Sequence, residues 1–193
     1  MASIQKLTGG LHSAGLLNTL PRKVVAALSA IALLAISARV QVPFWPVPMT
    51  LQTLTVLLVG YLLGFRLAMA TMAAYLISGA AGLPMFAGTP ERGLGLAYMV
   101  GPTGGYLVGF VFAAAIASQI RALRSKVGVL AIPAGLFFAS AAIHVFGFVW
   151  LSQYLGVETA WKAGVLPFVL GDLVKLGLAS LICYRFSRLQ RSH

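Results

Sequence analysis

The sequence predicts an all-α membrane protein, built as one bundle of six transmembrane helices with both termini in the cytoplasm. Three observations lead to this prediction. First, 60% of the 193 residues are hydrophobic and only 9% are charged, whereas about 25% are charged in an average soluble domain. Second, the apolar residues form six segments, each close to the roughly 20 residues that cross the hydrocarbon core. Third, the basic residues lie mainly on one side of these segments.

The basic residues set the predicted orientation. Most of the 14 Lys and Arg residues lie in the two tails, near Arg66 or in the 121–126 loop. Because Lys and Arg are enriched in cytoplasmic loops, these segments are predicted to be cytoplasmic. Trp45, Trp150 and Trp161 then fall at the outer interface, where aromatic belts lie. The net charge of +11 is therefore attributed to membrane topology and not to a nucleic-acid partner.

One domain fills the length of the chain. Residues 1–23 are predicted to form a cytoplasmic tail, 24–184 the substrate-binding bundle, and 185–193 a basic cytoplasmic tail. The first span is predicted at Val24–Val40. Residues 41–48 follow, where three prolines within six residues exclude a helix interior and predict an extended surface loop.

The second and third spans are joined by a short turn. The second opens at Thr50, whose side chain is suited to cap a helix N-terminus, and runs to about Gly64. Arg66 marks the turn, and the third span ends near Leu83. A glycine-rich loop over 88–95 connects it to the second half of the bundle.

The last three spans follow the same pattern. The fourth is predicted at Tyr98–Ser118 and the fifth at Val127–Leu151, with the basic 121–126 loop between them. A short amphipathic connection containing Trp161 leads to the sixth span, predicted at Gly164–Tyr184.

The sixth span contains an acid and a base, Asp172 and Lys175, within an otherwise apolar run. Residues three apart share a helix face. In hydrocarbon, a charge near the middle of a span costs about 2.5–3.5 kcal/mol on insertion scales. The pair is therefore interpreted as functional, and a neutralised pair that only joins helices is the alternative.

Polar positions of three spans lie at similar depth. With both termini inside, the second, fourth and sixth helices enter the membrane from outside. Gln52, the 101–106 stretch and Asp172 all lie within the first turns of these helices. Lys175 offers a cation for a carboxylate, and Tyr106 a ring and a hydroxyl. A pocket that opens outward would suit a small, mostly apolar, acidic molecule with polar groups at separate ends.

Structural alternatives exist for several of these residues. Gln52 could instead make an interhelical hydrogen bond, worth about 0.6 kcal/mol. Gly104 and Gly105 could admit a ligand to the backbone, or could serve helix packing, because small residues recur at four-residue spacing up to Gly109. Arg92 could contact the ligand or be a solvated loop charge.

The sequence contains no recognisable catalytic or metal-binding set. His144 stands alone in the fifth span, there are only three acids, and Cys183 is the one cysteine. Neither HExxH nor GxSxG occurs, and no phosphate-binding loop carries its lysine. A transport protein without metal or cofactor is therefore predicted, with any ATP hydrolysis on partner subunits.

Four sequence blocks resemble those of the BioY family of biotin transporters, the substrate-binding membrane subunits of energy-coupling-factor transporters. They occur in the family's order between residues 46 and 175 and are specific in combination. The blocks are Pro46-Val47-Pro48-Met49-Thr50-Leu51-Gln52-Thr53, Gly82-Leu83-Pro84, Gly101-Pro102-Thr103-Gly104-Gly105-Tyr106, and Leu166-Pro167-Phe168 continuing to Gly171-Asp172-Leu173-Val174-Lys175.

The resemblance implies a six-helix bundle that binds biotin near the outer face of a prokaryotic inner membrane. Asp172 and Lys175 would contact the ligand, and Gln52, Tyr106 and the loop after the third helix would complete the pocket. Biotin, with a carboxylate tail, a polar ureido ring and an apolar thioether body, matches the chemistry expected of the pocket.

The chain departs from some relatives in two places. They carry an Asn in the loop, where this chain has Thr-Pro-Glu-Arg-Gly over 89–93, and an Arg after the Tyr, where this chain has Leu107. Lys175 and Arg92 are therefore both candidates to bind the ligand carboxylate.

The resemblance also implies partners: a transmembrane coupling protein and two ABC-type ATPases. Small residues on the first helix, here Ala26 and Ala30, would form the docking surface for the coupling protein, with packing inside the bundle as the alternative. Two other functions stay open: the same architecture binding another vitamin, and a proton-coupled or facilitated carrier for another small carboxylated solute, with Asp172 as the titrating group.

Overall fold

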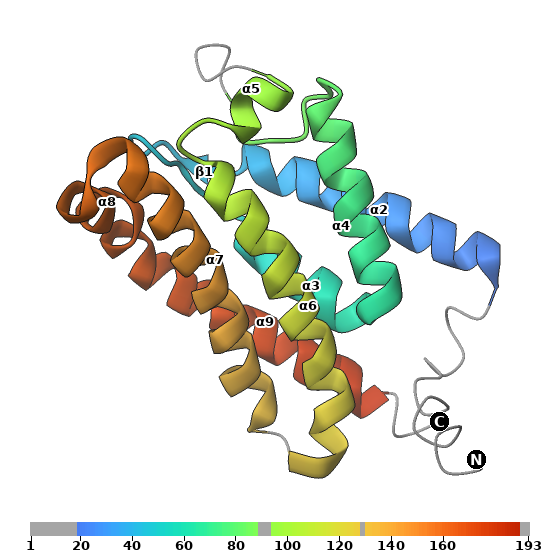
Figure 1. Cartoon of the computed structure of the whole chain (residues 1–193). Coiled ribbons are helices and arrows are strands. Elements are labelled where there is room, and N and C mark those ends of the chain that lie inside the picture. The colour runs from blue at the N-terminus through green and yellow to red at the C-terminus, as the bar shows by residue number, and fades with distance from the viewer. Residues whose placement is uncertain (1–18, 89–93, 128–129, 190–193) are drawn as a thin grey trace, which may run out of the picture.

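The computed structural model describes residues 19–88, 94–127 and 130–189. These ranges are helical apart from one small hairpin and the connecting turns (Figure 1). In chain order, the elements are α2 (Leu20–Arg39), β1 (Gln41–Val42), β2 (Met49–Thr50), α3 (Gln52–Leu63), α4 (Phe65–Ala80), α5 (Leu96–Met99), α6 (Gly104–Val127), α7 (Ala131–Leu155), α8 (Val157–Gly164), the 3-10 helix η2 (Leu166–Phe168) and α9 (Val169–Leu189).

The six predicted spans correspond to α2, α3, α4, α6, α7 and α9, which confirms the all-α membrane fold. Among the described residues, four stretches are long and apolar enough to cross a bilayer: 20–39, 104–121, 131–155 and 157–189. Helices α3 and α4 are apolar but have only 12 and 16 residues, fewer than the roughly 20 of a full crossing. The two helices are connected by a single residue, Gly64, which has a φ of 74°.

Several helix ends differ from the predicted ranges. Helix α2 begins about one turn before the predicted first span, within the predicted tail. Helix α6 begins at Gly104 and continues to Val127, so the 121–126 segment predicted as a loop is helical. Helices α7 and α9 each start and end about one turn later than predicted. Hydropathy indicates where lipid contact ends, whereas Arg and Lys are good helix formers that extend a helix beyond it.

The prediction of an extended surface loop over 41–48 is partly wrong. Strand β1 opens this segment and pairs antiparallel with β2, which follows it, with Gln41 opposite Thr50. The prolines do exclude a helix, but Pro46, Val47 and Pro48 are buried, because the hairpin folds these apolar residues over the ends of the helices. Leu51, and not Thr50, takes the N-cap position of α3.

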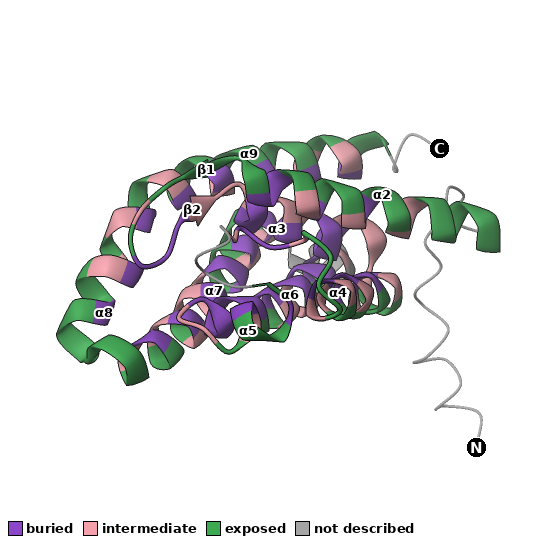
Figure 2. Cartoon of the chain, turned by 90° about the horizontal axis from the view of Figure 1, so that it is seen from above, coloured by how far each residue is buried: buried purple, intermediate pink, exposed green. Residues whose placement is uncertain are grey.

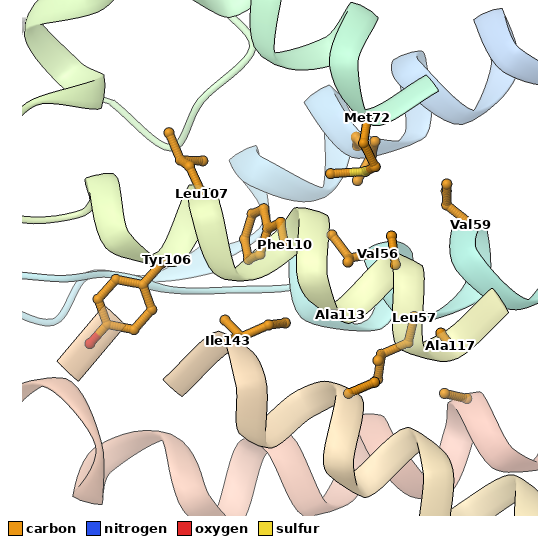
Figure 3. Close-up of a cluster of buried hydrophobic side chains, with 14 of the residues drawn as sticks. Val56, Leu57, Val59, Met72, Tyr106, Leu107, Phe110, Ala113, Ala117 and Ile143 are labelled. Atoms are coloured by element: carbon orange, nitrogen blue, oxygen red, sulfur yellow. The ribbon is translucent and has the colours of Figure 1, made fainter. Parts of the chain in front are cut away.

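Helix α3 lies in the middle of the bundle, with α2 and α9 on one side and α4, α6 and α7 on the other (Figure 2), and α6 packs against α3, α4 and α7. Figure 3 shows the apolar side chains that fill this interface. Those at its centre are Val56, Leu57, Met72, Phe110, Ala113, Ala117 and Ile143.

The outer surface of the bundle is apolar, as expected of a protein surrounded by lipid. On α9, Leu170 and Val174 are 78% and 65% exposed, whereas Asp172 and Lys175 are each 8% exposed (Figure 2). This helix thus places its charges inside and its leucines outside, the reverse of a helix on a soluble protein.

The two ends of the bundle differ. Helix α2 begins and α9 ends toward one end, whereas the hairpin and α8 lie toward the other (Figures 1 and 2). Trp45 in the hairpin connection and Trp161 in α8 therefore share the end opposite the start of α2. An even number of spans predicts that the first helix begins and the last helix ends on the same side of the membrane, as they do here. The assignment of that side to the cytoplasm stays a prediction.

Candidate functional site

The acid and base of α9 form a buried ion pair. Asp172 lies in the first turn of the helix, and the Lys175 ammonium donates a hydrogen bond to its Oδ1 at 2.8 Å. Both side chains are about nine-tenths buried. The predicted shared helix face is confirmed.

A third ionisable residue joins this pair from α7. Nε2 of His144 lies 2.9 Å from Oδ2 of Asp172, and Nδ1 lies 3.2 Å from the Ser140 carbonyl oxygen. The interpretation of His144 as an isolated histidine is therefore wrong. Its position within an apolar span could have identified it as a candidate site residue, because ionisable residues inside membranes usually have a function and a partner.

His144 also lines a small cavity between the helices. The cavity has a volume of about 40 Å³, enough for a few water molecules. Gln52 of α3 and Tyr106 of α6 meet His144 here, as do buried residues of the hairpin and η2 such as Val47 and Phe168. Gln52 and Tyr106, which the sequence placed at one depth, thus line one cavity. Asp172 does not line it but contacts His144, which does.

The Gln52 amide connects the cavity to the segment that follows α4. Its Nε2 donates to the Tyr75 hydroxyl at 2.6 Å, and this hydroxyl donates to the Met85 carbonyl oxygen at 3.0 Å. Tyr75 is fully buried. Gln52 therefore both lines the cavity and makes the interhelical hydrogen bond considered as its alternative.

Replacing Tyr75 with Phe should destabilise the protein. The substitution leaves the Gln52 amide and the Met85 carbonyl without their buried partner, which typically costs about 1–3 kcal/mol. We expect the melting temperature in detergent to fall by several degrees. Tyr184→Phe is the matched control, because this half-buried ring also packs against the core but its hydroxyl has no hydrogen-bond partner within the described residues. Equal melting temperatures for the two variants would contradict the prediction.

Tyr106 lines the cavity, and its hydroxyl makes a structural hydrogen bond. The hydroxyl donates to the Gly164 carbonyl oxygen at 2.7 Å, which ties α6 to the end of α8. The ring packs edge-on to His144, with centroids 6.5 Å apart, and also lies against Phe168. Figure 3 shows Tyr106 at the end of the apolar cluster away from Val59 and Ala117. Its hydroxyl is thus already occupied by a structural bond.

The other predicted site residues lie elsewhere. Gly104 and Gly105 approach Trp150 of α7 closely and are not among the residues that line the cavity, an arrangement that fits packing, while their contact with a ligand stays a prediction. Arg92 lies outside the described residues. Ala30 is buried within the bundle and Ala26 is half-buried, an arrangement that also fits packing. Among the described residues, no group of three or more His, Cys, Asp or Glu could hold a metal ion.

Comparison with known proteins gives a consistent result. The model of the BioY family matches residues 8–192. A "Probable biotin transporter BioY" of Pyrococcus horikoshii is 37% identical over 159 residues, which are 80% of this chain and 90% of that protein. The "Biotin transporter BioY" of Thermotoga maritima is 35% identical over 162 residues, 82% and 92% of the two chains.

The fold is also similar to that of a solved protein. Its crystal structure is described as the S-component for biotin from an ECF-type ABC transporter. The two structures superpose with a TM-score of 0.74 over 97% of this chain and 95% of the other, at 22% sequence identity.

Proposed function

Because the chain belongs to the BioY family, we propose that it is the biotin-binding membrane subunit of a biotin importer. It captures biotin at the outer face of a prokaryotic cell membrane and delivers it to the cytoplasm. It is a multi-pass transport protein and not an enzyme.

The observation that carries this proposal is the buried Asp172–Lys175–His144 cluster beside the cavity. Ionisable groups within an apolar bundle are costly and are characteristic of substrate pathways. Biotin has hydrogen-bonding groups at both ends and an apolar body between them. A cavity with Gln52 and His144 among aromatic and aliphatic side chains has the corresponding mixture of polar and apolar contacts.

Binding requires the cavity to widen. Its volume of about 40 Å³ is far below the roughly 300 Å³ or more of a typical small-molecule pocket. Val47 and Pro48 of the hairpin connection and Ala87 of the segment after α4 line the cavity without being part of a helix. We therefore infer that these segments move outward when biotin enters.

Partners supply the energy in this proposal. The 193 residues contain no phosphate-binding loop with its lysine, so ATP would be hydrolysed by two ABC-type ATPases joined through a transmembrane coupling protein. Ala26 and Ala30 on α2 remain the proposed docking positions. Because Ala30 is already buried inside the bundle, docking there would need α2 to shift.

Calorimetry with the purified protein in detergent tests the proposal. We expect nanomolar binding of biotin, weaker binding of desthiobiotin and no binding of riboflavin. Lys175→Ala should lose tight binding, because it removes the buried cation that pairs with Asp172. Absence of biotin binding by the folded wild-type protein would refute the proposal, and riboflavin binding would redirect it to another vitamin.

An uptake assay separates the importer from a proton-coupled carrier. Uptake that depends on co-expressed ATPases supports the importer. Uptake that collapses with an uncoupler but survives ATP depletion supports the carrier, with Asp172 as the titrating group.

A further inference from the structure

A second, larger hollow lies at the end of the bundle that carries α8. This α8 groove has a volume of about 480 Å³ and lies between Phe44 and Trp45 of the hairpin connection and Glu158, Lys162 and Pro167 of α8 and η2. The connection reaches toward α8 in both views (Figures 1 and 2). Small-molecule sites have about 300–1,000 Å³, whereas the inner cavity has about 40 Å³. Of these two hollows, the α8 groove is the one with room for a ligand of the size of a vitamin.

The α8 groove and the inner cavity share a wall. In the hairpin connection, Phe44 and Trp45 line the groove, and Val47 further along lines the cavity. In η2, Pro167 lines the groove and the next residue, Phe168, lines the cavity. The rings of Phe44 and Phe168 meet edge-on, with centroids 6.3 Å apart. These two rings therefore stand between the groove and the cavity.

The groove offers contacts for a molecule with an apolar body and a carboxylate. Trp45 is 79% exposed, so that it and Phe44 present aromatic surface to an apolar ligand. The Lys162 ammonium donates a hydrogen bond to Oε1 of Glu158 at 2.6 Å. Because an ammonium has three N–H donors, one bond to Glu158 leaves others for a ligand carboxylate. Lys162 is largely exposed, and water weakens such contacts, so a ligand held there leaves again easily.

We propose that the α8 groove is an encounter site, in which biotin binds before it reaches the inner cavity. Its carboxylate binds Lys162 while its apolar body lies on Trp45 and then passes between Phe44 and Phe168 into the widened cavity. This inference deepens the proposed function and rests on it. The ligand leaves Lys162 once it is in the cavity, so Lys162 sets how fast biotin enters and leaves and not how tightly it is finally held.

A contact that is made during passage but not in the final complex has a distinct kinetic signature. Its loss slows association and dissociation by the same factor, because both directions cross the same barrier, and Kd stays unchanged. We expect Lys162→Gln to lower both rate constants for biotin by about 3- to 5-fold, the size of effect that one exposed charge has. Lys162→Arg keeps the charge and should keep both rates.

The rates are measured with radiolabelled ligands and the purified protein in detergent, and dissociation is followed after a chase with unlabelled ligand. Biotinamide has an uncharged tail and should bind wild type and Lys162→Gln at equal rates. Raising the salt concentration should slow the association of biotin with wild type more than with Lys162→Gln, because salt screens exposed charges. Lys23→Gln is the matched control, since Lys23 is an exposed lysine near the start of α2, at the opposite end of the bundle.

The shared wall is tested with Phe44→Ala. Removing this ring opens the passage between the groove and the cavity, so association and dissociation should both become faster. The increase should be similar for biotin and biotinamide, because the ring blocks both ligands regardless of charge. Melting temperatures in the same detergent establish that each variant is folded, and the Lys162 variants decide the matter if Phe44→Ala does not fold.

Four results would overturn the inference. Unchanged rates in Lys162→Gln would show that the groove is not on the path. Faster dissociation with unchanged association would place Lys162 on the finally bound ligand. Equal slowing by Lys23→Gln would show that the overall charge attracts biotin, and unchanged or slower association with folded Phe44→Ala would place the entry elsewhere. Failure of folded wild type to bind biotin at all is a different result, which removes the proposed function and this inference together.

Discussion

Asp172→Asn should lower the affinity for biotin by at least about 100-fold. Asparagine keeps the volume of the side chain but removes its charge, so Lys175 loses its buried counter-ion and His144 its carboxylate partner. Removing one partner of a buried ion pair typically costs about 3–5 kcal/mol. In addition, the amide presents an N–H where the carboxylate presented an acceptor. Both effects act on the charged cluster that His144 connects to the cavity.

The measurement is calorimetric titration of wild type and Asp172→Asn with biotin, accompanied by thermal melting in the same detergent. Glu158→Gln is the matched control. Glu158 is also an acid paired with a lysine, at 2.6 Å from Lys162, but both side chains are largely exposed, and such pairs contribute about 1 kcal/mol or less. If Asp172→Asn binds biotin normally and only melts earlier, the ion pair serves solely to join helices.

The sequence predicted the charged face of α9 because its signal is local. An acid and a base three residues apart within an apolar helix share a face by geometry alone, and lipid makes the inward direction the favourable one. The helix count followed from hydropathy in the same way. These parts of the fold depend on nearest neighbours along the chain and not on which helices pack together.

The contact between His144 and Asp172 could not be predicted from local sequence patterns. Its distance from Asp172 depends on α7 packing beside α9, and periodicity does not specify helix neighbours. The same limit applies to Gln52, whose partner Tyr75 belongs to another helix. It also applies to Pro46–Pro48, where the prolines predicted a loop but not its burial over the cavity. Each of these contacts joins positions far apart in the sequence, so it becomes visible only in the folded chain.

The glycines at the start of α6 had two possible roles on the sequence alone, ligand contact or helix packing, and the structure shows that they lie at a close contact between α6 and α7. A Cβ added at Gly105 would lie 2.2 Å from Cβ of Trp150 and 2.5 Å from the Phe146 carbonyl oxygen. Because backbone atoms form part of this contact, a side-chain rotation cannot relieve it. Gly109 makes a similar approach to Ile143, and Ile143 and the adjoining His144 both line the cavity. The glycines of α6 therefore determine how closely α7 packs against α6, and with it the position of His144 in the site.

Gly105→Ala should accordingly destabilise the protein and weaken biotin binding together. Overpacking of this kind typically costs about 1–3 kcal/mol, which corresponds to about 2–12 °C in melting temperature for a chain of this size. Gly177→Ala is the matched control, since Gly177 lies in α9 with nothing within 4 Å of an added Cβ. Both substitutions gain helix propensity, up to about 1 kcal/mol, so their difference isolates the packing. A Gly105→Ala protein as stable as Gly177→Ala, with unchanged affinity, would show that α6 and α7 can separate without disturbing the site.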